Sequence, residues 1–239
     1  YFLSSQAHQC PAIIFYNVYE CCNNDEDAAT QTVNTKAAGA NILLADGSQN
    51  TVNGSYVAKI YESYTLNEAG TEVTDSDKLH KYDGAVYSKM SLNVGGNGAL
   101  TINAQNEGLD SERHLTLNGG TVNIVSGNDG INTNEDGISV TTIHGGTLNV
   151  TVGKTATEGD GIDSNGWLVI NGGTVISAAK PHSDSGLDSS CGSFIHGGTV
   201  VALGAAMDWA ESDSEQVTMN LQFSQRQNGS VQVIAEDGT

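Results

Sequence analysis

The sequence has few basic residues and no long hydrophobic run. Lys and Arg together number 9 against 28 Asp and Glu, which gives the 239 residues a formal net charge of −19. So acidic a chain repels nucleic acid and anionic membranes, and we expect no nucleic-acid partner. The longest apolar run, at 11–16, is too short to cross a bilayer, so we expect no membrane insertion.

Aromatic residues and prolines are also scarce. Aromatic residues make up 6% of the chain and prolines number 2, whereas glycines number 29. Many glycines with few prolines indicate frequent tight turns rather than a disordered linker. Because so few aromatic rings are present, any sizeable core has to be built from aliphatic side chains in a regular arrangement.

A phrase of strand-like residues around a double glycine occurs four times. It reads LTLNGGTVNI, TTIHGGTLNV, LVINGGTVIS and SFIHGGTVVA, and the first glycines of the four pairs are 26, 27 and 25 residues apart. A repeat of about 25 residues made of short strands and glycine turns is typical of a parallel β-helix with one coil per repeat. A propeller or sandwich needs longer, more even antiparallel strands. We therefore predict an all-β, single-stranded parallel β-helix, a solenoid.

Stacked coils place equivalent aliphatic residues above one another, about 4.8 Å apart. The predicted inward columns are Val122, Leu148, Val175 and Val200; Leu117, Ile143, Ile170 and Ile195; and Leu109, Ile131, Ile162 and Leu187. One coil cannot bury its own apolar face, whereas a stack buries a continuous column.

The flanks repeat less clearly. We expect the β-helix to cover 1–203, with a polar side loop at about 61–80. Segments 217–223 and 230–236 alternate between apolar and polar residues and predict a hairpin. Residues 204–239 are then a C-terminal β cap that protects the last edge, or the start of a truncated segment.

A second phrase with paired acids precedes each double glycine: NEGLDS, NDGINT, GDGIDS and DSGLDS. Stacking places its polar residues in two neighbouring columns. The first column holds Glu107, Asp129, Asp160 and Asp184, with Ser185 beside the last step; the second holds Asp110, Asn132, Asp163 and Asp188.

These columns bring like charges together. Unit charges 5 Å apart repel by roughly 3 kcal/mol at an effective dielectric near 20. Solvent screening, protonation or a cation therefore has to reduce this repulsion. Oxygen ligands suit a hard cation, and Ca²⁺ tolerates loose geometry better than Mg²⁺. We predict Ca²⁺ at these eight residues. The alternative is that Asp and Asn only favour turns and cap backbone N–H groups, which explains the second acid less well.

Three of the four cysteines lie near the N-terminus: Cys10, Cys21 and Cys22, with Cys191 far away in the sequence. They have no CxxC spacing, which argues against a zinc site. We weigh a disulfide from Cys10 to Cys21 or Cys22, and cross-links between chains through Cys21 and Cys22.

Several segments together resemble a known family. They are QCPAIIFYN (9–17), ILLADGSQNTV (42–52), DGAVYSKMSLNV (83–94), GDGIDSNGWLVINGGTV (159–175) and the block 204–239. In this order they are similar to secreted carbohydrate-binding β-helix proteins of bacterial type, which bind cellulose and pectin-like polymers and resemble polysaccharide lyases in fold. The resemblance implies a right-handed helix, calcium near the acidic turns, a secreted or cell-surface location, and a polysaccharide partner that is bound without demonstrated cleavage. Asn132 and Ser185 depart from the acidic pattern.

We weigh three functions. A polysaccharide binder needs aromatic platforms or bridging calcium; Trp167 and Tyr87 are the candidate sugar-stacking residues, although either ring can instead pack on its own coil. A structural subunit of an extracellular fibre or surface matrix would self-associate through the helix ends. A calcium-dependent polysaccharide lyase needs a base beside the cation, for which Arg113 is the first candidate and Lys89 and Lys180 are weaker ones. We favour the binder, and catalysis stays an open question.

Overall fold

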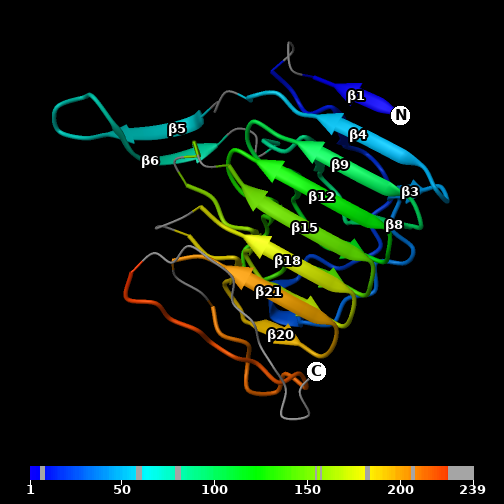
Figure 1. Ribbon diagram of the computed structural model, residues 1–239. Helices are drawn as coiled ribbons and strands as arrows, with labels where there is room; N and C mark the ends of the chain where they lie inside the picture. The colour runs from blue at the N-terminus through cyan, green and yellow to red at the C-terminus, as the bar shows by residue number, and fades with distance from the viewer. Residues whose placement is uncertain are drawn as a thin grey trace.

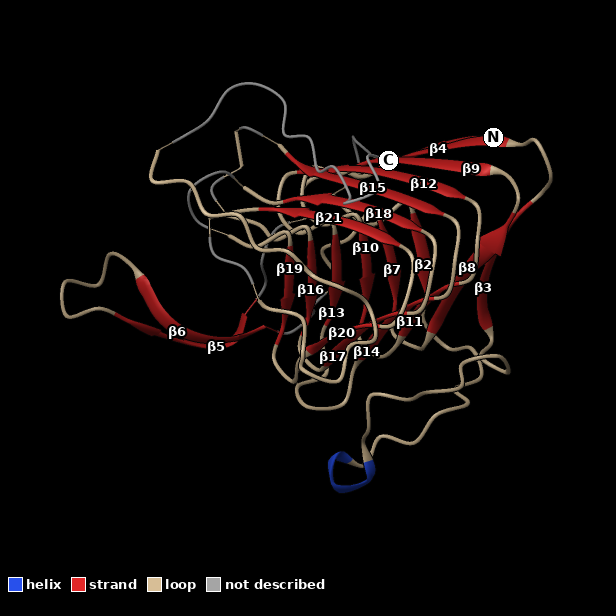
Figure 2. Cartoon of the chain, turned by 60° about the horizontal axis from the view of Figure 1, so that its bottom comes forward, coloured by secondary structure: helices blue, strands red, loops and turns tan. Residues whose placement is uncertain are grey.

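The computed structural model is a parallel β-helix built from three parallel sheets (Figures 1 and 2). It describes residues 1–5, 9–57, 61–78, 82–153, 155–156, 158–180, 184–205 and 208–225. Within these residues the single helical element is the 3₁₀ turn η1 (Glu26–Ala28). A search of the same residues for a helix with the length and apolarity to cross a membrane finds none.

Each coil takes one strand from each sheet. Sheet A consists of β1 (Phe2–Ser4), β4 (Gln49–Asn53), β9 (Ala99–Asn103), β12 (Thr121–Ser126), β15 (Thr147–Val152), β18 (Thr174–Ala178) and β21 (Thr199–Leu203). Sheet B consists of β2 (Ile13–Phe15), β7 (Val86–Ser88), β10 (Leu109–Ser111), β13 (Ile131–Thr133), β16 (Ile162–Ser164) and β19 (Leu187–Ser189). Sheet C consists of β3 (Ala40–Leu44), β8 (Leu92–Gly96), β11 (Leu115–Leu117), β14 (Val140–Ile143), β17 (Trp167–Ile170) and β20 (Ser193–Ile195).

The predicted repeat is confirmed, with one coil per repeat. The expectation of two strands around each double glycine was incomplete, because the acidic phrase supplies a third strand to every coil. That strand is only three residues long, for example Ile162–Ser164, so its alternation is too short to be evident in the sequence.

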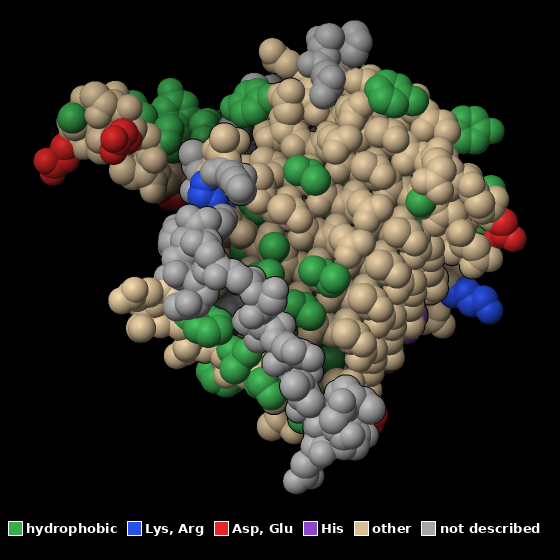
Figure 3. Space-filling view, viewed as in Figure 1, with side chains coloured by type: hydrophobic (Ala, Val, Ile, Leu, Met, Phe, Trp, Pro, Cys, Tyr) green, Lys and Arg blue, Asp and Glu red, His purple; other side chains and the backbone are tan. Residues whose placement is uncertain are grey.

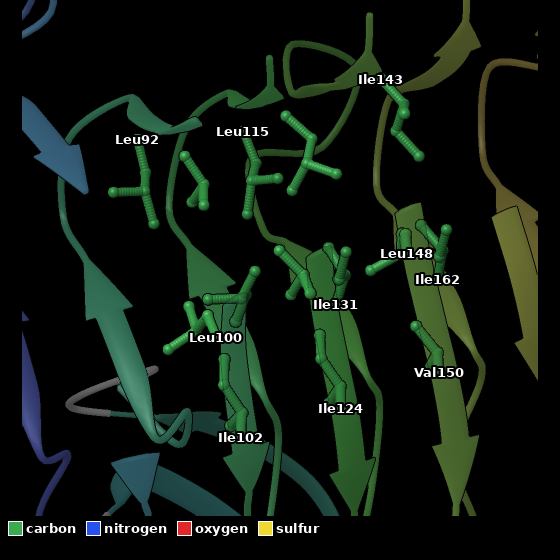
Figure 4. Packing of buried hydrophobic residues seen from close by; sticks show 14 of the residues in the cluster. Leu92, Leu100, Ile102, Leu115, Ile124, Ile131, Ile143, Leu148, Val150 and Ile162 are labelled. Atoms are coloured by element: carbon green, nitrogen blue, oxygen red, sulfur yellow. The ribbon is translucent and has the colours of Figure 1, made fainter. Parts of the chain in front are cut away.

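All three predicted aliphatic columns exist in register. Val122 pairs with Leu148, and Leu148 pairs with Val175. Leu117 pairs with Ile143 in sheet C, as Leu109 does with Ile131 in sheet B. These side chains point into the space between the sheets and belong to one buried cluster (Figure 4). Aliphatic residues in register thus replace the aromatic core that the composition excludes.

The double glycine makes the turn from sheet C to sheet A. Its second member has a positive φ in each of the four repeats, for example 86° at Gly146 and 86° at Gly173. Side chains rarely adopt this left-handed conformation, which explains why the phrase keeps a glycine there. The glycine of the acidic phrase is required for a different reason, since a Cβ on Gly161 would collide with Ser177 Oγ across the helix interior.

The side loop expected at 61–80 is a hairpin. β5 (Tyr61–Leu66) and β6 (Val73–Lys78) pair antiparallel and project from the stack (Figure 1). Among the described strands, β5 and β6 pair only with each other, which is why the residues do not follow the coil repeat.

The C-terminal hairpin prediction is corrected in its first half. Residues 217–223 form no strand, and 230–236 lie outside the described residues. An irregular segment nevertheless caps the last coil. Ser189 N–H donates to Asp208 Oδ2 at 2.9 Å, Ile195 N–H donates to Ser214 Oγ at 3.0 Å, and Gln216 N–H donates to the Ile195 carbonyl at 3.0 Å. These bonds satisfy edge groups of β19 and β20 that a bare solenoid end would expose.

Candidate functional site

The second polar column lies on sheet B, with one residue in each of β10, β13, β16 and β19. Asp110 pairs with Asn132, Asn132 with Asp163, and Asp163 with Asp188, as predicted. Their neighbours Leu109 and Ile131 point into the core, so these polar side chains point outward. The residues of this column therefore lie in strands and not in turns. This is why the preference of Asp and Asn for turns did not account for the second acid of each phrase.

The first polar column lies at the bend that leads into sheet B. Its carboxylates bind backbone N–H groups of the following coil: Asp129 Oδ1 accepts from Asp160 N at 2.7 Å, and Asp160 Oδ1 accepts from Ser185 N at 2.5 Å. Asp184 lies one residue before the column position and accepts from Gly159 N at 3.1 Å. Capping of backbone N–H groups thus accounts for part of this column, as the turn alternative proposed.

The end of the two columns nearer the N-terminus, in the coils of β10 and β13, is buried. Asp110 is 0% exposed, Glu107 4%, Asp129 8% and Asn132 9%. Asn132 Nδ2 donates to Glu107 Oε1 at 3.3 Å, whereas Asn132 Oδ1 is buried and has no hydrogen-bond partner among the described residues. A buried amide oxygen without a donor is costly in a folded protein. Because the neighbouring groups are carboxylates, a cation would suit this oxygen.

Burial raises the pKa of Asp110 in the second column and of Asp129 in the first. It raises the pKa of Asp110 well above the ordinary value, with Glu112 and Asp83 adding repulsion, and it does the same to Asp129 beside Glu107. Both shifts arise first from loss of solvent and then from neighbouring negative charge, and a bound cation would offset both causes.

The columns are more open in the next coil, that of β16, and the pKa values of Asp163 and Asp160 are raised there as well. Burial, together with Asp160 and Asp188, raises the pKa of Asp163 to about 7. Burial and the neighbouring acids Asp188 and Asp184 raise the pKa of Asp160 to about 6, although a hydrogen bond from Ser185 opposes the shift.

The donor set fits Ca²⁺ in its chemistry, because it consists of carboxylate and amide oxygens with one buried amide oxygen left unsatisfied. It is not a compact cage of carboxylates. Among the described residues, the group of three acidic, His or Cys side chains whose ligand atoms lie within 4.8 Å of one another is Glu20, Cys21 and Cys22, away from the columns. A calcium ion would therefore be held by a few carboxylates from adjacent coils together with Asn132 Oδ1, and not by all eight predicted residues at once.

Three acids near the columns were missed from the sequence. Asp83 donates its backbone N–H to Asp110 Oδ2 at 3.2 Å and is itself 6% exposed. Glu112 raises the pKa of Asp110, and Asp208 raises that of Asp188. The phrase DGAVYSK at 83–89 was a usable signal for Asp83, whereas Asp208 follows the last repeat and has no equivalent in the other coils.

The predicted sugar-stacking residues differ in exposure. Tyr87 is only 3% exposed, donates its hydroxyl to Glu112 Oε1 at 3.0 Å, and packs edge-on against Tyr82 at 5.5 Å between ring centroids. Burial and Glu112 raise the pKa of the Tyr87 hydroxyl. Its ring is therefore not available as a sugar platform, and this prediction is corrected. Trp167 is half-buried on β17, one residue before the core residue Leu168.

The expected disulfide from Cys10 to Cys21 or Cys22 is not formed, since all four cysteines are free thiols. Cys21 Sγ lies 3.1 Å from Cys22 Sγ, and Glu20 accepts hydrogen bonds from the backbone and hydroxyl of Ser91. Burial and the adjacent Cys21 raise the pKa of the Cys22 thiol to about 12, which disfavours a reactive thiolate.

The described side-chain interactions of Arg113 and Lys89 lie outside the acid columns. Arg113 interacts electrostatically with Glu20 and His114, and its backbone N–H donates to Ser111 Oγ at 3.3 Å. Lys89 Nζ lies 4.8 Å from the centre of the Tyr16 ring. Lys180 N–H donates to the Gly159 carbonyl at 2.9 Å, which places its backbone beside the first column.

The pKa shifts predict the pH dependence of the calcium-free protein. With a pKa of about 7 for Asp163 and about 6 for Asp160, the folded chain releases these protons at higher pH than the unfolded chain, in which both carboxyls have the ordinary pKa of 3.8. The free energy of unfolding should therefore fall as pH rises from about 4 to 7. In chelator we expect the melting temperature to decrease over this range, and Asp163→Asn should weaken the decrease. Asp75→Asn, an exposed change on the β5–β6 hairpin, is the control; a melting temperature that rises from pH 5 to 7 would contradict the interpretation.

Comparison with known proteins assigns the chain to a family. A family model described as Carbohydrate-binding domain-containing protein matches residues 5–238, which include every strand from β2 to β21 and both polar columns. No curated protein and no solved structure gives a significant match. Because the match spans almost the whole chain, the protein belongs to the family of carbohydrate-binding domain-containing proteins.

Proposed function

We propose that the protein is an extracellular, calcium-stabilised β-helix that binds a cellulose- or pectin-like polysaccharide without cleaving it. Membership of a carbohydrate-binding family supports the glycan partner. The observation that carries the calcium proposal is the buried oxygen cluster of Glu107, Asp129 and Asn132, in which Asn132 Oδ1 has no hydrogen-bond partner among the described residues.

Calcium would supply positive charge between coils that already have their acids in register. Glu107 comes from the coil of β10, and Asp129 and Asn132 come from the coil of β13, so an ion shared by them would link two turns of the solenoid. Asp163 and Asp160 offer a second, more open set of oxygens one coil further along. Such sites of modest affinity suit the millimolar calcium outside cells.

Binding without cleavage is supported by what surrounds the acids. The polar columns use carboxylates to hold backbone N–H groups, as Asp129 and Asp160 do. Arg113, the first candidate base, interacts instead with Glu20. Lyase chemistry requires a base next to the substrate carboxylate, and hydrolysis requires two carboxyls that flank the scissile bond.

Affinity electrophoresis tests this proposal. We expect the protein to be retarded in gels that contain soluble β-glucan or polyuronate, and to release no unsaturated product from polyuronate with calcium at alkaline pH. Arg113→Ala should leave the retardation unchanged. Steady release of unsaturated product that disappears in Arg113→Ala would contradict the proposal and support a lyase.

One observation favours a structural subunit as the second candidate. The N-terminal end of the helix contains an apolar cavity of about 210 Å³, lined by residues that include Leu3, Ile13, Ile42 and Val52. Here β1, β2 and β3 are the outermost described strands of their sheets. An apolar surface at this end suits stacking of one β-helix on another. Filaments that lengthen with protein concentration in electron micrographs would support this candidate.

A further inference from the structure

The described strands of sheet A contain no Asp, Glu, Lys or Arg, in a chain with a formal net charge of −19. Figure 2 shows the sheet as one layer along the side of the helix, and Figure 3 looks onto it. On the visible part of this face, acidic and basic side chains lie toward the margins (Figure 3). The chain has 28 acidic residues, yet none lies in these seven strands. An uncharged surface of this kind suits an uncharged partner.

Hydroxyl and amide groups form straight columns on this face. One column of consecutive strand partners is Thr121, Thr147, Thr174 and Thr199. Asn149 Nδ2 donates to Asn123 Oδ1 at 2.9 Å, and Asn103 Nδ2 donates to Asn53 Oδ1 at 2.8 Å. Because each amide binds its neighbour, the side chains are held in fixed orientations and present donors and acceptors at the strand spacing of about 4.8 Å.

Aliphatic side chains lie between these polar columns. Val125 is 49% exposed, Ile176 41%, Val201 43% and Leu203 55%. They provide an apolar surface for the C–H faces of sugar rings, while the neighbouring Thr and Asn groups can bond to sugar hydroxyls. The face therefore combines both kinds of contact that a flat, uncharged sugar polymer offers.

We propose that the outward face of sheet A binds an uncharged polysaccharide that lies flat along it. This inference rests on the proposed function, and it names the binding surface and the neutral class of glycan. A polyuronate is disfavoured here because the face has no Lys or Arg to meet its carboxylates. The acid columns that suit calcium lie on sheet B and at the bend that leads into it, so no acid of these columns lies among the outward residues of the sheet A strands to hold a bridging calcium ion.

The size of the face favours a polymer over a second copy of the chain. Seven strands about 4.8 Å apart span about 29 Å, and five residues per strand give about 16 Å, or roughly 500 Å². A stable dimer buries about 800 Å² on each partner. A polymer does not need to bury that area on one protein molecule, because it continues beyond the face and can bind further protein molecules along its length.

Binding to insoluble cellulose, a neutral glucan, tests the proposal. Ile176→Asp and Val125→Asp each place a carboxylate at an exposed position on the face, and Ala69→Asp adds the same charge at the exposed turn of the β5–β6 hairpin. We expect each face variant to raise the dissociation constant at least about tenfold, because the carboxylate loses water against an uncharged surface. Ala69→Asp should bind like the wild type, and the thermal melts of all three should confirm folding.

The outcomes separate this inference from the proposed function. If the wild type binds cellulose and both folded face variants bind equally well, the face is wrong while polysaccharide binding stands. If the wild type binds only polyuronate in the presence of calcium, the neutral class is wrong. If it binds neither polymer, the proposed function fails and the inference fails with it. A wild-type dimer in sedimentation that Ile176→Asp dissociates would make the face a contact between copies, which overturns the proposal.

Discussion

Calcium should raise the melting temperature of the chelated protein at neutral pH by about 5–10 °C for each occupied site. An ion at one hundred times its dissociation constant adds about 2.7 kcal/mol to the free energy of unfolding. For a chain of this length, 1 kcal/mol corresponds to about 2–4 °C. The physical reason is the excess of buried carboxylate charge: Asp110 and Asp129 both have a raised pKa, and the nearby Asn132 Oδ1 lacks a partner among the described residues.

Magnesium at the same concentration is the matched control. It demands closer octahedral geometry and loses its water reluctantly, so it should raise the melting temperature much less. The measurement is a thermal scan by circular dichroism in chelator, calcium and magnesium. A melting temperature that does not change with calcium would show that protonation and solvent are sufficient to reduce the repulsion between the carboxylates of the columns.

Leu148→Ala should lower the free energy of unfolding by about 2–5 kcal/mol, which is the second large effect. Leu148 is 0% exposed and lies between Val122 and Val175 in one aliphatic column. Its loss leaves a cavity that contacts both neighbouring coils, and in a solenoid each coil is stabilised by its neighbours. Thermal or denaturant unfolding of the variant measures the effect.

Val125→Ala on β12 is the control for this change. Val125 is 49% exposed on the outward face of sheet A, so its truncation should cost within about 0.5 kcal/mol. An equal loss of stability in the two variants would contradict the assignment of inward and outward residues in sheet A.

The repeat made most of the fold predictable. Val122, Leu148 and Val175 are in register because each lies three residues after the first glycine of its pair. The column of Asp110, Asn132 and Asp163 follows from the separate alignment of the acidic phrases. Wherever the chain repeats itself, position along one coil determines position in the stack.

Features outside the repeat were not predictable. The cap is built by irregular hydrogen bonds from Asp208 and Ser214, which no periodicity reveals. The burial of Tyr87 depends on Tyr82 and on Glu112 from the next coil, so the sequence of its own coil could not show it. The uncharged face of sheet A was visible in the sequence only after the strands were placed.

Direct titration of the chelated protein with calcium, followed by calorimetry, tests the central claim most directly. We predict saturable binding of at least one ion per chain, and a marked loss of that binding in Asn132→Leu, which replaces the unsatisfied amide with an apolar group of similar size. Asp75→Asn on the hairpin should bind like the wild type. Titration without saturable heat, or equal binding by Asn132→Leu and the wild type, would contradict the claim that the oxygen columns of this β-helix bind calcium.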